Sequence, residues 1–211
     1  MTRILSISVT TIAIFTAAST VVFIARSASA ADVEGGRKKA EACGACHGAD
    51  GNATMPVVPS LAGQPPFYTH WQLALFRDGR RKDPQMAALA ANLSDAEMAD
   101  LAVYYAGQRP TARPAVAGDA EAMATGQRLA QLHHCASCHA QNLPEPRYTP
   151  HLAGQSYEYL AKQLREFKAR TRGELDGATM TSVVQPLTEQ EVEILARYFA
   201  SLPPATEKGR P

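Results

Sequence analysis

The sequence is poor in cysteine and tryptophan, with four cysteines and one tryptophan among its 211 residues. So few cysteines exclude a small scaffold held together by many disulfides. Charge of neither sign is in excess, because 21 lysines and arginines face 20 acidic residues. That balance excludes the strongly basic surface that binding to nucleic acid requires. Beyond the first 30 residues there is no convincing alternation of apolar and polar residues, so no β-strand is predicted.

The longest apolar run lies at the start of the chain, roughly from Ile4 to Ala25, after the basic Arg3. The small residues Ala28-Ser29-Ala30 follow it and fit a cleavage site. The sequence therefore predicts that residues 1–30 are a signal peptide and that the remainder is exported. The alternative is an uncleaved membrane anchor, because the run approaches the length that spans a bilayer. Removing it leaves 19 basic and 20 acidic residues, a formal charge of −1.

The rest of the chain contains two copies of one pattern. LAGQPPFYTHWQLALFRDGRR from Leu61 matches LAGQSYEYLAKQLREFKARTR from Leu152, at an offset of 91. MAALAANLSDAEMADLAVYYA from Met86 matches MTSVVQPLTEQEVEILARYFA from Met180, at an offset of 94. Three matching segments in the same order, including the cysteines, indicate a duplication. The predicted division is a domain over 31–110, an Ala-rich linker over 111–122, a domain over 123–203 and a flexible tail over 204–211.

Each half is predicted to be helical. Ser94 and Glu97 fit a capping box, and Thr188 and Glu191 repeat it. Apolar residues follow each box at helical spacing, and a further helix is expected after each LAGQ, with prolines suiting its first turn in the first copy. The fold class is therefore all-α, in two tandem domains. Each half is small for a hydrophobic core, so something else is expected to help fill it.

All four cysteines fall in two Cys-x-x-Cys-His runs: Cys43, Cys46 and His47, then Cys135, Cys138 and His139. This run is typical of covalent haem attachment. Thiols three residues apart share one face of a helical turn and can reach the two vinyl groups of one porphyrin. The next residue can bind the iron through its imidazole. The sequence predicts two covalently bound haem c groups.

Three other uses of these thiols are weaker. A disulfide within either run would leave the following histidine unexplained. A thioredoxin-like dithiol expects a preceding strand, which is missing. A zinc site with four cysteine ligands needs both pairs to converge, whereas the repeat places each pair in its own domain.

A sixth ligand for each iron is expected from Met86 and Met180, which the repeat matches and which the sequence places in polar loops. A thioether is a suitable axial ligand beside histidine; the alternative is that these methionines only fill space. Pro59 and Pro150 also match, each two residues before LAGQ. Their carbonyls could accept the Nδ1 proton of the haem histidine, or the prolines could simply shape a turn, and the sequence does not separate the two.

The runs CGACHGADGN and CASCHA, each followed by LAGQ and by the methionine segment, resemble the class I c-type cytochromes, and within them the dihaem cytochrome c4 type. The resemblance covers nearly all of the chain after residue 30. It implies two class I cytochrome c domains, His47 and Met86 on the first iron, His139 and Met180 on the second, and electron transfer in the bacterial periplasm.

Two irons with both axial positions filled predict an electron carrier rather than an enzyme. The expected donor is a cytochrome reductase complex or a dehydrogenase, and the expected acceptor is a terminal oxidase. Peripheral association with a membrane stays open. The alternatives are a dihaem electron-accepting subunit of a periplasmic dehydrogenase, such as a flavocytochrome, and a dihaem peroxidase, which would need one iron without methionine.

The basic stretch RDGRRK at residues 77–82 precedes Met86. It is expected either to steer an acidic partner towards the first haem or to be an ordinary solvated loop.

Overall fold

The computed structural model describes residues 31–113, 120–139, 148–172 and 177–204. The predicted signal peptide and most of the predicted tail lie outside these ranges. Within them the chain forms helices and no strand, which confirms the all-α prediction. The helices are α1 (Val33–His47), α2 (Pro66–Arg77), α3 (Pro84–Ala90), α4 (Asp95–Ala106), α5 (Ala120–Leu132), α6 (Ala136–His139), α7 (Tyr157–Lys168), α8 (Ala178–Val184) and α9 (Glu189–Ser201).

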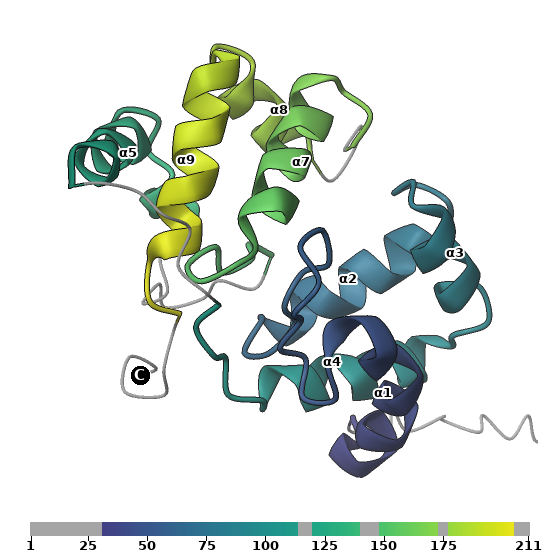
Figure 1. Ribbon diagram of the computed structural model, residues 1–211. Coiled ribbons are helices and arrows are strands. Elements are labelled where there is room, and N and C mark those ends of the chain that lie inside the picture. The colour runs from purple at the N-terminus through teal and green to yellow at the C-terminus, as the bar shows by residue number, and fades with distance from the viewer. Residues whose placement is uncertain (1–30, 114–119, 140–147, 173–176, 205–211) are drawn as a thin grey trace, which may run out of the picture.

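The helices form two groups that follow the duplication (Figure 1). In the first group α4 packs against α1 and α2, and α3 packs against α2. In the second group α9 packs against α5 and α7, and α8 packs against α7. Apolar side chains of the last helix of each group are buried, which confirms the predicted stripes. The buried residues of α4 and α9 are Met98, Leu101, Ala102, Tyr105, Val192, Leu195, Ala196 and Ala200.

Local sequence signals place the helix starts. Ser94 accepts a hydrogen bond from the backbone N–H of Glu97, whose carboxylate accepts from the N–H of Ser94. Thr188 and Glu191 make the same reciprocal pair. Both predicted capping boxes are therefore confirmed. Pro66 begins α2, where its missing N–H costs no helical hydrogen bond.

One expectation about local structure is wrong, one helix cap was not expected, and one helix extends into the predicted linker. Met86 and Met180 lie on the short helices α3 and α8 rather than in loops. Asp83 caps α3 by accepting from the N–H of Met86, and the sequence reading had missed this cap. Helix α5 begins at Ala120, so the last three residues of the predicted linker are helical.

The two groups differ in the helix that leads to the histidine of each attachment run. In the first, α1 continues without a break through Cys43 to His47. In the second, α5 ends at Leu132 and α6 starts at Ala136, with His134 between them in the left-handed region at a φ of 53°. The second attachment run therefore stands on a separate turn.

In the described part of the chain, no helix is both long enough and apolar enough to cross a lipid bilayer.

A glycine sets the distance between the first and last helices of each group. A Cβ added to Gly36 would come closer than 3.0 Å to the carbonyl oxygen of Asp100 and to the Cβ of Tyr104 on α4. Gly126 on α5 lies in the same way against Tyr198 on α9. Only glycine allows each pair of helices to approach this closely. In the first half, α1 of this pair also carries the attachment run.

Replacing Gly36 by alanine is expected to lower the free energy of unfolding by about 1–3 kcal/mol, because the new methyl group meets backbone that cannot move aside. Chemical denaturation followed by circular dichroism measures it. Gly44→Ala on the same helix is the control, since its Cβ would lie 3.4 Å from the nearest atom, and Ala136 holds that place in the second run. A Gly36→Ala chain as stable as the Gly44→Ala chain would contradict the prediction.

Candidate haem attachment sites

The first attachment run lies on the last turns of α1. Cys43 is half-buried and packs against the core cluster of Ala40, Leu101 and Tyr105, whereas Cys46 is exposed. His47 is buried, with 7% of its surface exposed. Beyond it, Gly48 ends the helix at a φ of 79°, a conformation that suits glycine. The chain can then turn back towards the face that carries the histidine.

The ring of His47 is held in one orientation. Its Nδ1 lies 2.9 Å from the carbonyl oxygen of Pro59, and a carbonyl can only accept, so Nδ1 carries the proton. Burial lowers the pKa of His47, which favours the neutral ring. A neutral imidazole protonated at Nδ1 has its lone pair on Nε2. That is the tautomer a metal ligand requires.

The second attachment run has the same arrangement. Nδ1 of His139 lies 2.9 Å from the carbonyl oxygen of Pro150, and burial lowers the pKa of this histidine too. The hydroxyl of Thr149 donates to the carbonyl of Cys138 at 2.7 Å, which ties the returning loop to the run. In each half, therefore, the proline carbonyl contacts the histidine of its own attachment run. The two prolines are 91 residues apart, as the repeat requires.

The thiols do not suit the other uses considered. All four are free, so neither run is a disulfide in this structure. Burial raises the pKa of Cys43 and of Cys135, which disfavours the thiolate that a redox dithiol or a zinc ligand needs. Among the described residues, no three His, Cys, Asp or Glu side chains converge as a metal site. Two unpaired thiols and a fixed imidazole in each half do fit a covalently attached porphyrin.

The matched methionines lie on the helices that follow the LAGQ helices. Met180 on α8 packs against the same core cluster as Cys135, so both face one region of the second half. Met86 on α3 is half-buried, and α3 packs against α2. Their role as axial ligands stays a prediction.

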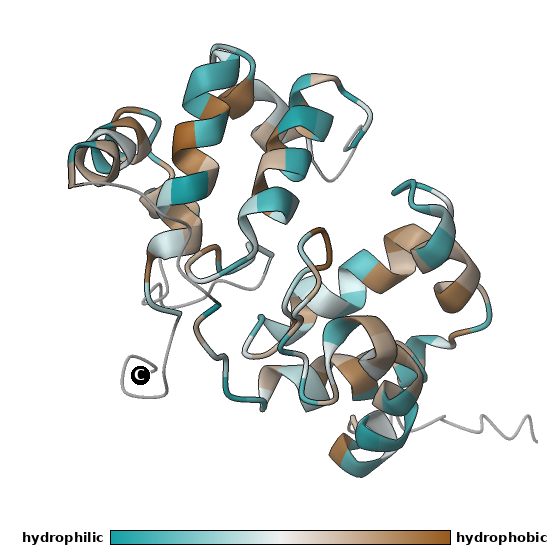
Figure 2. Ribbon diagram, in the orientation of Figure 1, coloured by the Kyte–Doolittle hydropathy of each residue, from teal (hydrophilic) through white to brown (hydrophobic). Residues whose placement is uncertain are grey.

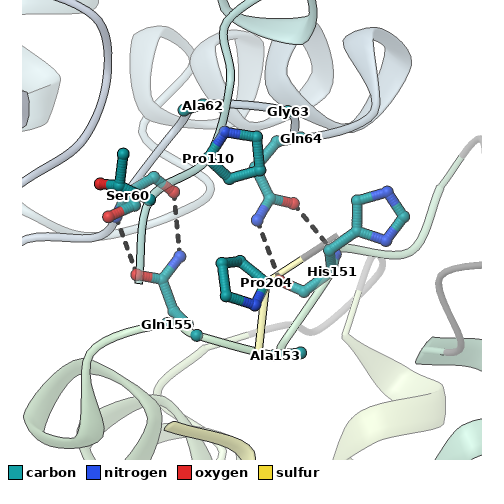
Figure 3. A pocket seen from close by; sticks show the side chains of 11 residues that line it. Ser60, Ala62, Gly63, Gln64, Pro110, His151, Ala153, Gln155 and Pro204 are labelled. Atoms are coloured by element: carbon teal, nitrogen blue, oxygen red, sulfur yellow. Dashed lines mark hydrogen bonds between the residues drawn. The ribbon is translucent and has the colours of Figure 1, made fainter. Parts of the chain in front are cut away.

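The two halves meet through the glutamines of LAGQ, an interface that we call the junction: Ser60, Gln64, His151 and Gln155. The side chain of Gln64 donates to the carbonyl of His151 at 2.9 Å and accepts from its N–H at 3.0 Å. Gln155 makes the same pair of bonds with Ser60, at 2.9 and 2.8 Å (Figure 3). Since Gln64 matches Gln155 and Ser60 matches His151 in the repeat, the junction has approximate two-fold symmetry.

A buried arginine from the first half extends the interface between the halves. The guanidinium of Arg81 stacks on the ring of Phe76, with 4.5 Å from Cζ to the ring centroid. It donates to Gln72 of its own half at 2.5 Å, and to Tyr159 and Gln163 of the other half at 3.1 and 2.9 Å.

Arg172 makes the matching contacts from the second half. It stacks on Phe167 at the same 4.5 Å and donates to Gln163 of its own half. Across the interface it donates to Tyr68 at 3.4 Å and to Gln72 at 3.2 Å. Arg81 and Arg172 are 91 residues apart, and each donates hydrogen bonds to equivalent residues of its own half and of the other half. These bonds fix how the two halves are oriented.

The basic stretch is not the uniform docking patch considered as one option. Arg81 is buried between the halves, and Arg77 forms ion pairs with Asp78 and Asp95 at 3.0 and 2.8 Å. The sequence reading missed this role, although one signal was available. Arg81 and Arg172, and the glutamines they bind, are polar residues retained at the same offset in both copies, which is unusual for solvated positions.

A helical tandem with a haem attachment run in each half is a dihaem c-type cytochrome. The family model described as cytochrome c matches residues 123–203, and the model described as cbb3-type cytochrome c oxidase subunit III matches residues 30–104. The chain carries two covalently bound haem c groups, one in each half, and it is an electron-transfer protein.

The chain belongs to the cytochrome c4 family. It is 37% identical to cytochrome c4 of Pseudomonas aeruginosa over 183 residues, 82% of this chain and 90% of that one. The crystal structure of reduced recombinant cytochrome c4 from Pseudomonas stutzeri matches with a TM-score of 0.74 at 34% identity, over 82% of this chain and all of that one. A thiosulfate dehydrogenase electron acceptor of Thiomonas intermedia is 32% identical, over 81% of this chain and 83% of that protein.

Proposed function

We propose that the chain carries single electrons between respiratory redox partners in the periplasm, with a terminal oxidase as the acceptor. The observation that supports this most is the pair of matching histidines, each with a lowered pKa that favours the neutral ring and each fixed at Nδ1 by a proline carbonyl. Such a site holds its metal ligand in the same position in both oxidation states. A carrier needs this constancy, because rearrangement on each electron transfer would slow it.

The residues divide the work at each site. Cys43 and Cys46 would hold the first haem, His47 would bind its iron through Nε2, and Met86 would supply a second protein ligand. Cys135, Cys138, His139 and Met180 would do the same in the second half. When bound, each haem supplies a one-electron couple between Fe(III) and Fe(II). Burial lowers the pKa of both histidines, which keeps their rings neutral and able to bind a metal.

The interface between the halves supports passage of an electron within the chain. The paired bonds of Gln64 and Gln155 and the buried guanidinium groups of Arg81 and Arg172 hold the halves in one orientation. Two redox centres on such a body keep a constant separation and a constant orientation. One half can then receive an electron while the other delivers it.

A second candidate is an electron-accepting partner or subunit of a periplasmic dehydrogenase. The observation that favours it is the 32% identity to a protein named as the electron acceptor of thiosulfate dehydrogenase. For both candidate functions, residues 1–30 direct export and are cleaved after Ala30. The two candidate functions differ in the electron donor and in whether the chain stays bound to that donor.

Reoxidation of the reduced holoprotein separates the two candidates. Mixed in air with membranes that contain a haem–copper oxidase, the fully reduced chain is expected to lose its reduced haem bands rapidly, and cyanide is expected to block this. Omission of the membranes is the control. If both haems stay reduced, the oxidase is not the acceptor. Co-elution with a dehydrogenase and reduction by its substrate would then favour the second candidate.

A further inference from the structure

Tyr105 on α4 has a hydroxyl group without a partner. Its side chain is 2% exposed, and among the described residues its oxygen makes no hydrogen bond. A buried hydroxyl that has lost its water and gained no partner is unfavourable, so such groups are rare in folded proteins. The partner of this hydroxyl is therefore to be sought in a neighbouring group whose chemistry changes when haem is attached.

The ring of Tyr105 cannot swing away to find another acceptor. A Cβ added to Gly51 would lie 2.7 Å from Cδ1 of the tyrosine, so the loop after α1 is pressed against the ring. The backbone carbonyl of Tyr105 also accepts from the N–H of Gly63 at 2.9 Å, which fixes this end of α4 to the loop. The direction of the hydroxyl is therefore set by the fold.

Cys43 packs against the core cluster that contains Tyr105, and its thiol interacts with the Tyr105 hydroxyl. As a free thiol, Cys43 points its weak donor at the carbonyl of Lys39, with 4.0 Å from sulfur to oxygen. Burial raises the pKa of this thiol, and the nearby Tyr105 hydroxyl partly offsets the rise. Once the sulfur forms a thioether it has no proton to donate and is an acceptor only. The Tyr105 hydroxyl, which interacts with this sulfur already, is then the one donor of the pair.

The second half lacks this donor. The repeat matches Tyr105 with Phe199, which packs against the core cluster that also contacts Cys135. The two attachment sites therefore share a cysteine pair and a fixed histidine, and one difference between them is a hydroxyl beside the half-buried first cysteine.

We propose that the hydroxyl of Tyr105 donates a hydrogen bond to the thioether sulfur of Cys43 and thereby raises the reduction potential of the first haem relative to the second. Donation draws electron density from the sulfur and turns the positive end of the O–H dipole towards the macrocycle. Both effects favour the reduced iron, which carries less positive charge. Hydrogen bonding to the groups around an iron centre is a known means of tuning its potential. This inference rests on haem attachment at Cys43, as in the proposed function.

Spectroelectrochemical titration of Tyr105→Phe tests the proposal. The potential of one haem is expected to fall, so that at a fixed applied potential its ratio of reduced to oxidised iron drops about twofold to threefold. This is a part of the roughly tenfold that a whole hydrogen bond is worth, because only its difference in strength between the two oxidation states shifts the potential. The other haem is expected to keep its potential. Tyr198→Phe is the control, because it removes a hydroxyl from α9 without touching this position. An unchanged or raised potential in Tyr105→Phe, with both haems attached, overturns the proposal.

A second measurement uses the wild-type holoprotein and needs no variant. Resonance Raman spectra in H2O and in D2O, after full exchange, are expected to show a small isotope shift of one thioether C–S band. No shift in either C–S band contradicts the hydrogen bond. Haem content and electron exchange with membranes are measured first. A chain without haem would refute the proposed function, whereas a loaded and active chain with no Tyr105 effect would refute only this inference.

Discussion

Replacing Cys135 and Cys138 together by alanine is expected to halve the haem content of the purified chain. The two runs stand on separate turns in separate halves, so loss of one pair of thiols removes one attachment site and leaves Cys43 and Cys46 intact. The pyridine haemochrome assay gives haem per chain, and haem staining after denaturing electrophoresis shows that the remainder is covalent. The wild-type chain is expected to carry two.

Stability is expected to fall in the same variant. Half-buried side chains that pack against the core of the second half, among them Cys135 and Met180, would lose their expected contact with the macrocycle. A half of about 80 residues has little core to spare. Thermal unfolding should therefore show an early transition in the second half. The reciprocal variant, Cys43→Ala with Cys46→Ala, is the matched control, and unchanged haem content in either variant would contradict the attachment sites.

Replacing Met86 by histidine is expected to lower the potential of the first haem by on the order of 0.1 V or more, within the roughly 0.8 V range that axial ligands set. Imidazole stabilises the ferric state better than a thioether does. The weak sulfur-to-iron band at the red edge of the ferric spectrum should lose about half its intensity, because one of two methionine ligands has gone. Spectroelectrochemical titration and the ferric spectrum measure both effects.

Met55→His is the control for that variant, since Met55 is exposed in the loop between α1 and α2 and has no counterpart in the other half. Figure 2 shows that this loop has an apolar tip. The control should keep both potentials. If Met86→His also keeps them, Met86 is a packing residue and not a ligand. A wild-type ferric spectrum that is high-spin, together with rapid peroxide turnover, would instead favour the peroxidase.

The parts of the structure that sequence reasoning predicted are those that local physics decides. A capping box needs two side chains three residues apart, and an apolar stripe needs only the helical period, so α4 and α9 could be placed from their own residues. Haem attachment was equally local, because its residues are contiguous. The contacts of His47 with Pro59 and of His139 with Pro150 span 12 and 11 residues, and the sequence left them open.

The interface between the halves was not predicted, because it is formed by residues that are far apart in the sequence. Arg81 lies in a stretch with other basic residues, and nothing in that stretch separates a buried guanidinium from a solvated one. Its partners Tyr159 and Gln163 are 78 and 82 residues away. The one signal in the sequence was the matched spacing of Arg81 and Arg172. That spacing indicates a symmetric contact only when the two halves are known to face each other.

The approximate two-fold symmetry of the junction has a consequence for how this protein could have arisen. Gln64 binds His151 of the second half, and Gln155 binds Ser60 of the first half. Such reciprocal contacts are typical of an isologous homodimer. A polar interface of this kind would hold two separate chains weakly. Joined in one polypeptide, the halves have a high effective concentration that dilution cannot reduce. Covalent joining also releases the copies from being identical, so a tyrosine can stand in one half where the other keeps a phenylalanine.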